Sequence, residues 1–150
     1  MNAEEQQAAA ERYGRWMAQH DRFANALGIE LQQVAPGYCR VSMQVREEML
    51  NAVGMTHGGA TFSLADFAFA VASNSHGRTA VALSAQINYP GASRAGDQLV
   101  AEAKEASVSG RTGLYNIEVR NQEQRLVAQF TGTVYRRTDN LSEWMNGEKR

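Results

Sequence analysis

The chain has very little cysteine and almost no net charge. Its single thiol, Cys39, has no partner for a disulfide within the 150 residues, and a lone cysteine is typical of a reducing compartment. A formal net charge of −1 gives no overall field that would attract nucleic acid or an anionic membrane. We therefore expect a cytoplasmic protein with no nucleic-acid partner and no membrane partner.

Proline and long apolar runs are also scarce. There are only two prolines, no internal repeat and no low-complexity linker, which predicts one domain over residues 1–150. The apolar run at 67–72 is far shorter than the roughly 20 residues of a membrane-spanning helix. Acidic residues in the opening "MNAEEQQAAAER" are unlike the basic start of a signal peptide. The three histidines do not stand at metal-ligand spacing, so we expect no metal site.

Helical signals occupy the beginning of the chain. Residues 3–20 have a helical apolar stripe, and Asp21 is placed to cap a second, short helix that Gly28 ends. Residues 1–27 are thus predicted to be a helical segment. The polar residues 139–150 are expected to form a flexible tail.

Strand signals fill most of the remainder. "CRVSMQV" alternates apolar and polar residues, and so does "YNIEV". Short connections rich in turn-forming residues separate the later runs. The predicted strands are 29–34, 39–45, 79–90, 97–107, 112–121 and 125–137. With one long helix at about 58–75, this pattern predicts an α+β fold in which an antiparallel sheet wraps around a central helix.

The central helix contains one acid among apolar and small residues. A helix that is apolar all round is expected to be enclosed, and burying an unpaired carboxylate costs several kcal/mol. Asp66 therefore has two interpretations. In the structural interpretation, it bonds a nearby hydroxyl, Thr61 or Ser63, or faces solvent along a narrow strip. In the functional interpretation, it is a base whose proton affinity is raised by desolvation.

The sequence His57-Gly58-Gly59 opens the same helix. The first amides of a helix lack internal acceptors and favour negative charge, and glycine lets a ligand approach the backbone closely. By itself the triplet is an ordinary turn into a helix. Together with the acid, it suggests an oxyanion hole and a base. His57 and Asp66 are separated by about 13 Å of rise and roughly half a turn, so one site that uses both needs two subunits.

These residues resemble a known family. The spaced set Asn51, His57-Gly58-Gly59 and Asp66, within "MLNAVGMTHGGATFSLADFAFAVASNSHG", is similar to hotdog-fold acyl-CoA thioesterases, most closely the PaaI-type phenylacetyl-CoA thioesterases. "ALGIELQQVAPGYCRVSMQV", "INYPGASRAGD" and the strands ending at "VYRR" extend the likeness over nearly the whole chain. The resemblance implies a hotdog fold of five to six strands.

The resemblance also implies the roles of the site residues. Asp66 would be the base or nucleophile and the Gly58 amide would hold the thioester carbonyl, while His57 and Asn51 shape the site. Asp66 would come from the opposite subunit of a homodimer, and two dimers would form a homotetramer. The implied substrates are aromatic acyl-CoA thioesters, with coenzyme A as part of the substrate and no separate cofactor.

Gly59, Arg94 and Arg111 are the candidates for contacts with coenzyme A. The two arginines are chosen by position only, and a solvated surface role is the alternative for each. Some relatives place a hydroxyl on the strand after the helix; Ser84 stands in that region and is not assigned a role.

Two other functions stay open. A hotdog hydratase for acyl-CoA or acyl-carrier protein needs an acid–base partner at position 71, which is valine here. A non-catalytic acyl-CoA binding or regulatory protein would use the same groove but would have no need of a buried acid. Release of the thiol distinguishes an enzyme from such a binder.

Overall fold

The computed structural model describes all residues, 1–150. Its elements are α1 (Ala3–His20), α2 (Arg22–Ala26), β1 (Glu30–Ala35), β2 (Tyr38–Gln44), a 3-10 turn η1 (Glu47–Met49), α3 (Gly58–Asn74), β3 (Arg78–Asn88), β4 (Gln98–Ser109), β5 (Thr112–Arg120), β6 (Leu126–Asn140) and α4 (Leu141–Met145). None of the helices is both long and apolar enough to cross a membrane.

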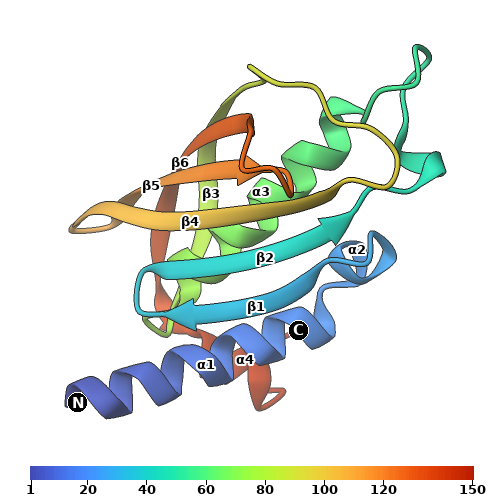
Figure 1. Cartoon of the computed structure of the whole chain (residues 1–150). Coiled ribbons are helices and arrows are strands. Elements are labelled where there is room, and N and C mark those ends of the chain that lie inside the picture. The colour runs from blue at the N-terminus through green and yellow to red at the C-terminus, as the bar shows by residue number, and fades with distance from the viewer.

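The six strands form one antiparallel sheet that curves around α3 (Figure 1). Their order is β1-β2-β4-β5-β6-β3. Because β3 follows α3 in the chain but pairs with β6, the connection returns to the far edge of the sheet. The predicted hotdog arrangement, with a central helix and an N-terminal helix, is confirmed.

The core lies between α3 and the concave face of the sheet. The predicted alternation is confirmed, since Val41 and Met43 on β2 and Tyr115 and Ile117 on β5 are buried. Gly132 on β6 lets Phe69 of α3 approach the sheet, because a Cβ there would lie 2.6 Å from the phenyl ring. Burying such an aromatic side chain typically stabilises a fold by about 1.5–3 kcal/mol.

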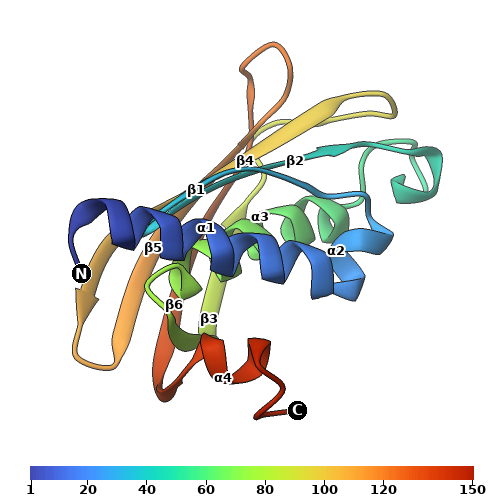
Figure 2. The same cartoon turned by 90° about the horizontal axis from the view of Figure 1, so that it is seen from below.

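Capping residues fix the N-terminal helices where the sequence predicts them. Asp21 accepts a hydrogen bond from Ala24 N at 2.9 Å and starts α2, and Gly28 follows it with a φ of 70°. Helix α1 runs beside β1 and crosses near α3, so that it covers one edge of the sheet (Figures 1 and 2).

The C-terminal segment differs from the expected tail. Strand β6 continues to Asn140, and α4 follows with a capping box between Asn140 and Glu143. The Leu141 amide donates to the Gly77 carbonyl at 2.7 Å, which ties this segment to the end of α3. Tertiary contacts therefore order part of 139–150.

The opposite edge of the sheet is open. Strand β3 pairs on one side only, with β6, and most of its length is exposed. Val81 is 44% exposed and Leu83 is 60% exposed. A long strand with free backbone groups and apolar side chains is a template for another strand.

Candidate active site

Helix α3 begins with one amide that has no acceptor. His57 is its N-cap residue, and its Nδ1 accepts from Gly59 N at 2.9 Å. The Ala60 amide donates to the His57 carbonyl at 2.9 Å. The Gly58 amide donates to no protein atom, so it remains free at the positive end of the helix dipole.

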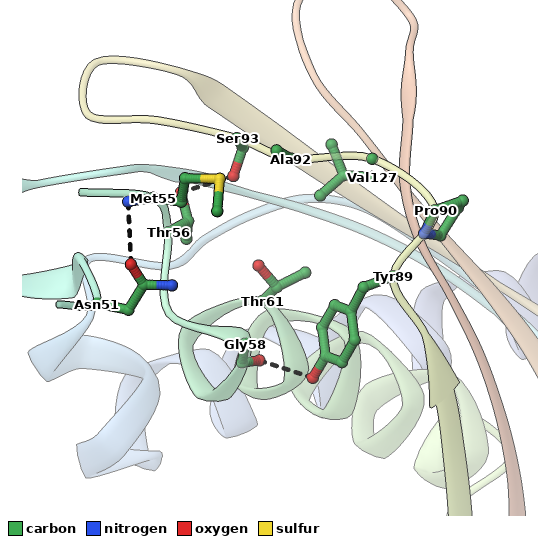
Figure 3. Close-up of a pocket in the computed structure, with 11 residues that line it drawn as sticks. Asn51, Met55, Thr56, Gly58, Thr61, Tyr89, Pro90, Ala92, Ser93 and Val127 are labelled. Carbon is green, nitrogen blue, oxygen red and sulfur yellow. Dashed lines mark hydrogen bonds between the residues drawn. The ribbon is translucent and has the colours of Figure 1, made fainter. Parts of the chain in front are cut away.

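Tyr89, just after β3, holds the position of Gly58. Its hydroxyl donates to the Gly58 carbonyl at 2.9 Å (Figure 3). A Cβ at position 58 would lie 3.2 Å from the tyrosine ring and its hydroxyl oxygen. A glycine is therefore what allows the ring and the helix start to pack together.

A cavity of about 360 Å³ lies at this helix start. Asn51, Thr61 and Ser93 line it with Gly58 and Tyr89. Figure 3 shows the Asn51 side-chain nitrogen and the Thr61 side chain directed into it. The Asn51 Oδ1 accepts from the amides of Val53 and Met55, which closes the loop before the helix and leaves the side-chain nitrogen for a ligand.

Asp66 lines a different cavity. This second cavity, of about 220 Å³, has an apolar wall of six residues and three polar side chains, those of Asp21, Ser63 and Asp66. Asp66 is half-buried, on a partly exposed strip of α3 that includes Ser63 and Ala70. The alternative in which Asp66 bonds Ser63 is wrong, because that hydroxyl donates to the Gly59 carbonyl at 2.7 Å.

Desolvation raises the pKa of the Asp66 carboxyl above its ordinary value, and the nearby Asp21 carboxylate raises this pKa further. No hydrogen bond lowers it. A carboxylate in such surroundings holds a proton more tightly than an exposed one. It is therefore a better base when it is ionised.

The structure separates the predicted site residues into groups. Asn51 and Gly58 line one cavity, and Asp66 lines the other. His57 fixes the helix start and uses the Gly59 amide to do so, which leaves Gly58 as the free donor.

The two predicted arginines lie at opposite ends of β4. Arg94 is exposed in the loop between β3 and β4, next to the cavity residue Ser93. Arg111 is in the turn after β4, and its guanidinium donates to the Tyr135 hydroxyl at 3.1 Å. Within one chain, only Arg94 is near the Gly58 cavity.

Tyr89 and Phe23 also line these cavities, and the sequence alone did not predict their positions. Tyr89 is 31 positions from Gly58, so only the fold brings them together. Phe23, on the short helix α2, lines the Asp66 cavity. The sequence held one signal for Phe23. A helix of only five residues has little need of a large aromatic side chain for its own packing, so such a residue there suggests another role.

Known proteins share this fold. The family model for the thioesterase superfamily matches residues 53–128. The acyl-coenzyme A thioesterase PaaI of Escherichia coli is 43% identical over 120 residues, which cover 80% of this chain and 86% of that protein. The E. coli PaaI structure, from the phenylacetic acid degradation operon, has a TM-score of 0.87 at 40% identity and covers 89% of this chain and 97% of its own.

Two further structures match at high coverage. A mutant of the phenylacetic acid degradation protein PaaI of Thermus thermophilus has a TM-score of 0.74 at 44% identity, over 77% of this chain and 98% of that one. A Streptococcus mutans protein bound to acetyl-CoA has a TM-score of 0.72 at 28% identity, over 75% and 90%.

The fold and these matches define the class of this protein, an acyl-CoA thioesterase. The chain belongs to the thioesterase superfamily and is a hotdog thioesterase of the PaaI type. Its substrate is an acyl-CoA.

Proposed function

We propose that this enzyme hydrolyses aromatic acyl-CoA thioesters, of the phenylacetyl-CoA or hydroxyphenylacetyl-CoA type, at sites shared between two copies of the chain. One observation supports a site that two chains share. The free Gly58 amide and the unpaired Asp66 carboxylate lie on one helix but line different cavities. A donor and a base that act on one thioester must both lie within hydrogen-bond reach of it.

The open β3 edge supports a dimer. If two β3 strands pair antiparallel across a two-fold axis, the α3 helices that precede them also run antiparallel. The start of one α3 then faces the middle of the other, so that Gly58 of one copy meets Asp66 of the other. The exposed side chains of Val81 and Leu83 become covered at the same interface. A homotetramer built from two such dimers stays a prediction.

In the proposed reaction, the Gly58 amide donates to the thioester carbonyl oxygen and stabilises the charge that develops there. Asp66 accepts a proton from a water molecule as that water attacks the carbonyl carbon. The tetrahedral intermediate collapses, the carbon–sulfur bond breaks, and CoA thiolate leaves with the free acid as the other product. The Asn51 side-chain nitrogen and the His57 cap hold the carbonyl and the helix start in place.

The coenzyme A part of the bound substrate is proposed to extend out of the Gly58 cavity along the β3–β4 loop, where Arg94 can contact its phosphates. Arg111 can do so only from another copy of the chain, so its assignment stays a prediction. The expected cytoplasmic location is compatible with an acyl-CoA substrate.

The hydratase alternative is weakened by the position of Val71. The residue that would have to supply the second acid–base group is buried in the core and 1% exposed. A valine side chain has no proton to exchange, so Asp66 lacks the partner that hydration chemistry needs.

Aromatic thioesters are expected to be better substrates than long-chain ones. Phe62 and Phe67 line the Asp66 cavity, and its volume of about 220 Å³ suits a compact ring. An apolar cavity of roughly 150 Å³ already holds benzene. Thiol release from phenylacetyl-CoA, its ring-hydroxylated forms and palmitoyl-CoA measures this preference, and a higher kcat/KM for palmitoyl-CoA would contradict it.

The pH profile of hydrolysis tests the two carboxylates together. Asp66 acts only when ionised, so kcat/KM should fall as the pH falls through its raised pKa. Asp21→Asn keeps an oxygen that can cap α2 but removes the charge that raises the pKa of Asp66. The acidic limb of Asp21→Asn should therefore move to lower pH.

The matched control is Glu123→Gln, which removes an exposed carboxylate in the turn between β5 and β6. Its acidic limb should coincide with that of the wild type. An acidic limb that stays in place in Asp21→Asn would show that Asp66 does not govern it.

A further inference from the structure

Helix α2 is held rigidly although it is only five residues long. Asp21 caps its start, and the Asn25 side chain donates to the Ala18 and Asp21 carbonyls. At its other end, the Arg46 guanidinium donates to the carbonyls of Ala26 and Leu27 at 3.0 and 3.1 Å. The backbone from which a side chain of this helix projects is therefore held in place, which favours a selective contact.

Phe23 is the residue that this helix presents. It is 64% exposed, although its neighbour Ala24 is buried in the core. Its ring borders the cavity that contains Asp66, together with Ile29, Phe62 and Phe67. An exposed aromatic ring that the core does not need, on a rim of apolar side chains, indicates a contact with a ligand.

Phe23 lies on a different element from the groups proposed to act on the thioester. Gly58 and Asp66 are on α3, within the superfamily match at 53–128, whereas α2, β1 and β2 precede that range. Helix α2 contributes a wall of the Asp66 cavity but none of the groups proposed to perform hydrolysis. Such a wall can set the choice of acyl group without altering those groups.

We propose that Phe23 is a specificity-determining residue, whose ring closes the cavity of Asp66 and packs against the aryl group of the substrate. This inference rests on the proposed function. An edge-to-face or offset contact between two aromatic rings adds to the apolar area that they bury. A short aliphatic acyl group does not reach the ring and gains nothing from it.

The test compares phenylacetyl-CoA with acetyl-CoA in wild type and Phe23→Ala, by thiol release. We expect kcat/KM for phenylacetyl-CoA to fall roughly tenfold, mostly through KM, while the value for acetyl-CoA stays within about twofold. Phe23→Leu, which keeps apolar bulk but not the ring, should lie between the two. Because the side chain is mostly exposed, both variants should keep the melting temperature of the wild type.

Leu114→Ala is the matched control. This side chain is 38% exposed on β5, borders neither cavity, and should leave the ratio of the two substrates unchanged. An equal loss for both substrates in Phe23→Ala, or no loss, would overturn the assignment. So would a shift from dimer to monomer on size exclusion, because Phe23 would then be an interface residue. If the wild type releases thiol from neither substrate, the proposed function itself fails.

Discussion

Asp66→Asn should abolish thiol release from every acyl-CoA that the wild type hydrolyses. The amide has nearly the same shape as the carboxylate but cannot accept a proton from water, so the chemical step loses its base. Binding should survive, because the Gly58 amide and its cavity are untouched. Calorimetric titration with a CoA thioester should therefore give a Kd close to that of the wild type.

The same variant should be at least as stable as the wild type at neutral pH. The folded state raises the pKa of Asp66, so ionising this group costs stability as the pH rises from the ordinary aspartate value of 3.8 through the raised one. The neutral amide of the variant carries no such cost. The gain in melting temperature should be present at pH 7 and should vanish at pH values below 3.8.

Two outcomes would refute the role of Asp66. Near-normal turnover in Asp66→Asn would show that another group activates water. A variant that fails to fold would show that the carboxylate is needed for structure, contrary to its lack of hydrogen-bond partners.

Two inactive variants should restore activity to each other when they are mixed. Asp66→Ala removes the base, and Gly58→Val displaces the acyl carbonyl from the amide, a loss that typically costs on the order of 10²–10³ in kcat. In a mixed dimer with shared sites, one site contains both defects and the other contains neither. Random mixing makes about half of the dimers mixed, so roughly a quarter of wild-type activity should return.

The mixing experiment needs refolding of the two variants together and mass spectrometry to confirm subunit exchange. Mixing Asp66→Ala with a differently tagged Asp66→Ala is the control and should recover nothing. If the exchanged heterodimer is no more active than either variant alone, each site lies within one chain. Gly58→Val also pushes on Tyr89, so its melting temperature must be measured beside its activity.

Local patterns predicted most of the fold because its elements are locally consistent. Alternation located β2 and β5, and Asp21 and Gly28 set the boundaries of the short second helix, which the structure confirms. The prediction that His57 and Asp66 cannot serve one site within a single chain followed from the rise and rotation per residue of a helix. Such features depend on neighbours a few positions apart in the chain.

Contacts between distant residues were the ones the sequence could not predict. The bond from Tyr89 to Gly58 and the place of Phe23 beside Asp66 exist only once the sheet has closed around α3. Helix α4 was missed for a related reason. Its five residues are too few for a stable isolated helix, and the bond between Leu141 and Gly77 orders it from outside.

The open β3 edge makes a newly synthesised chain prone to aggregate while no other strand covers this edge. No charged residue stands between Arg78 and Arg94, and the first proline after Arg78 is Pro90, beyond the end of the strand. Natural sheets usually prevent pairing of an edge strand with another chain by lysine, proline or a bulge that twists the edge away. Along β3, two register shifts are the only such feature. In the crowded cell, strands of other proteins can compete for this edge during synthesis. Correct pairing of β3 therefore competes with aggregation.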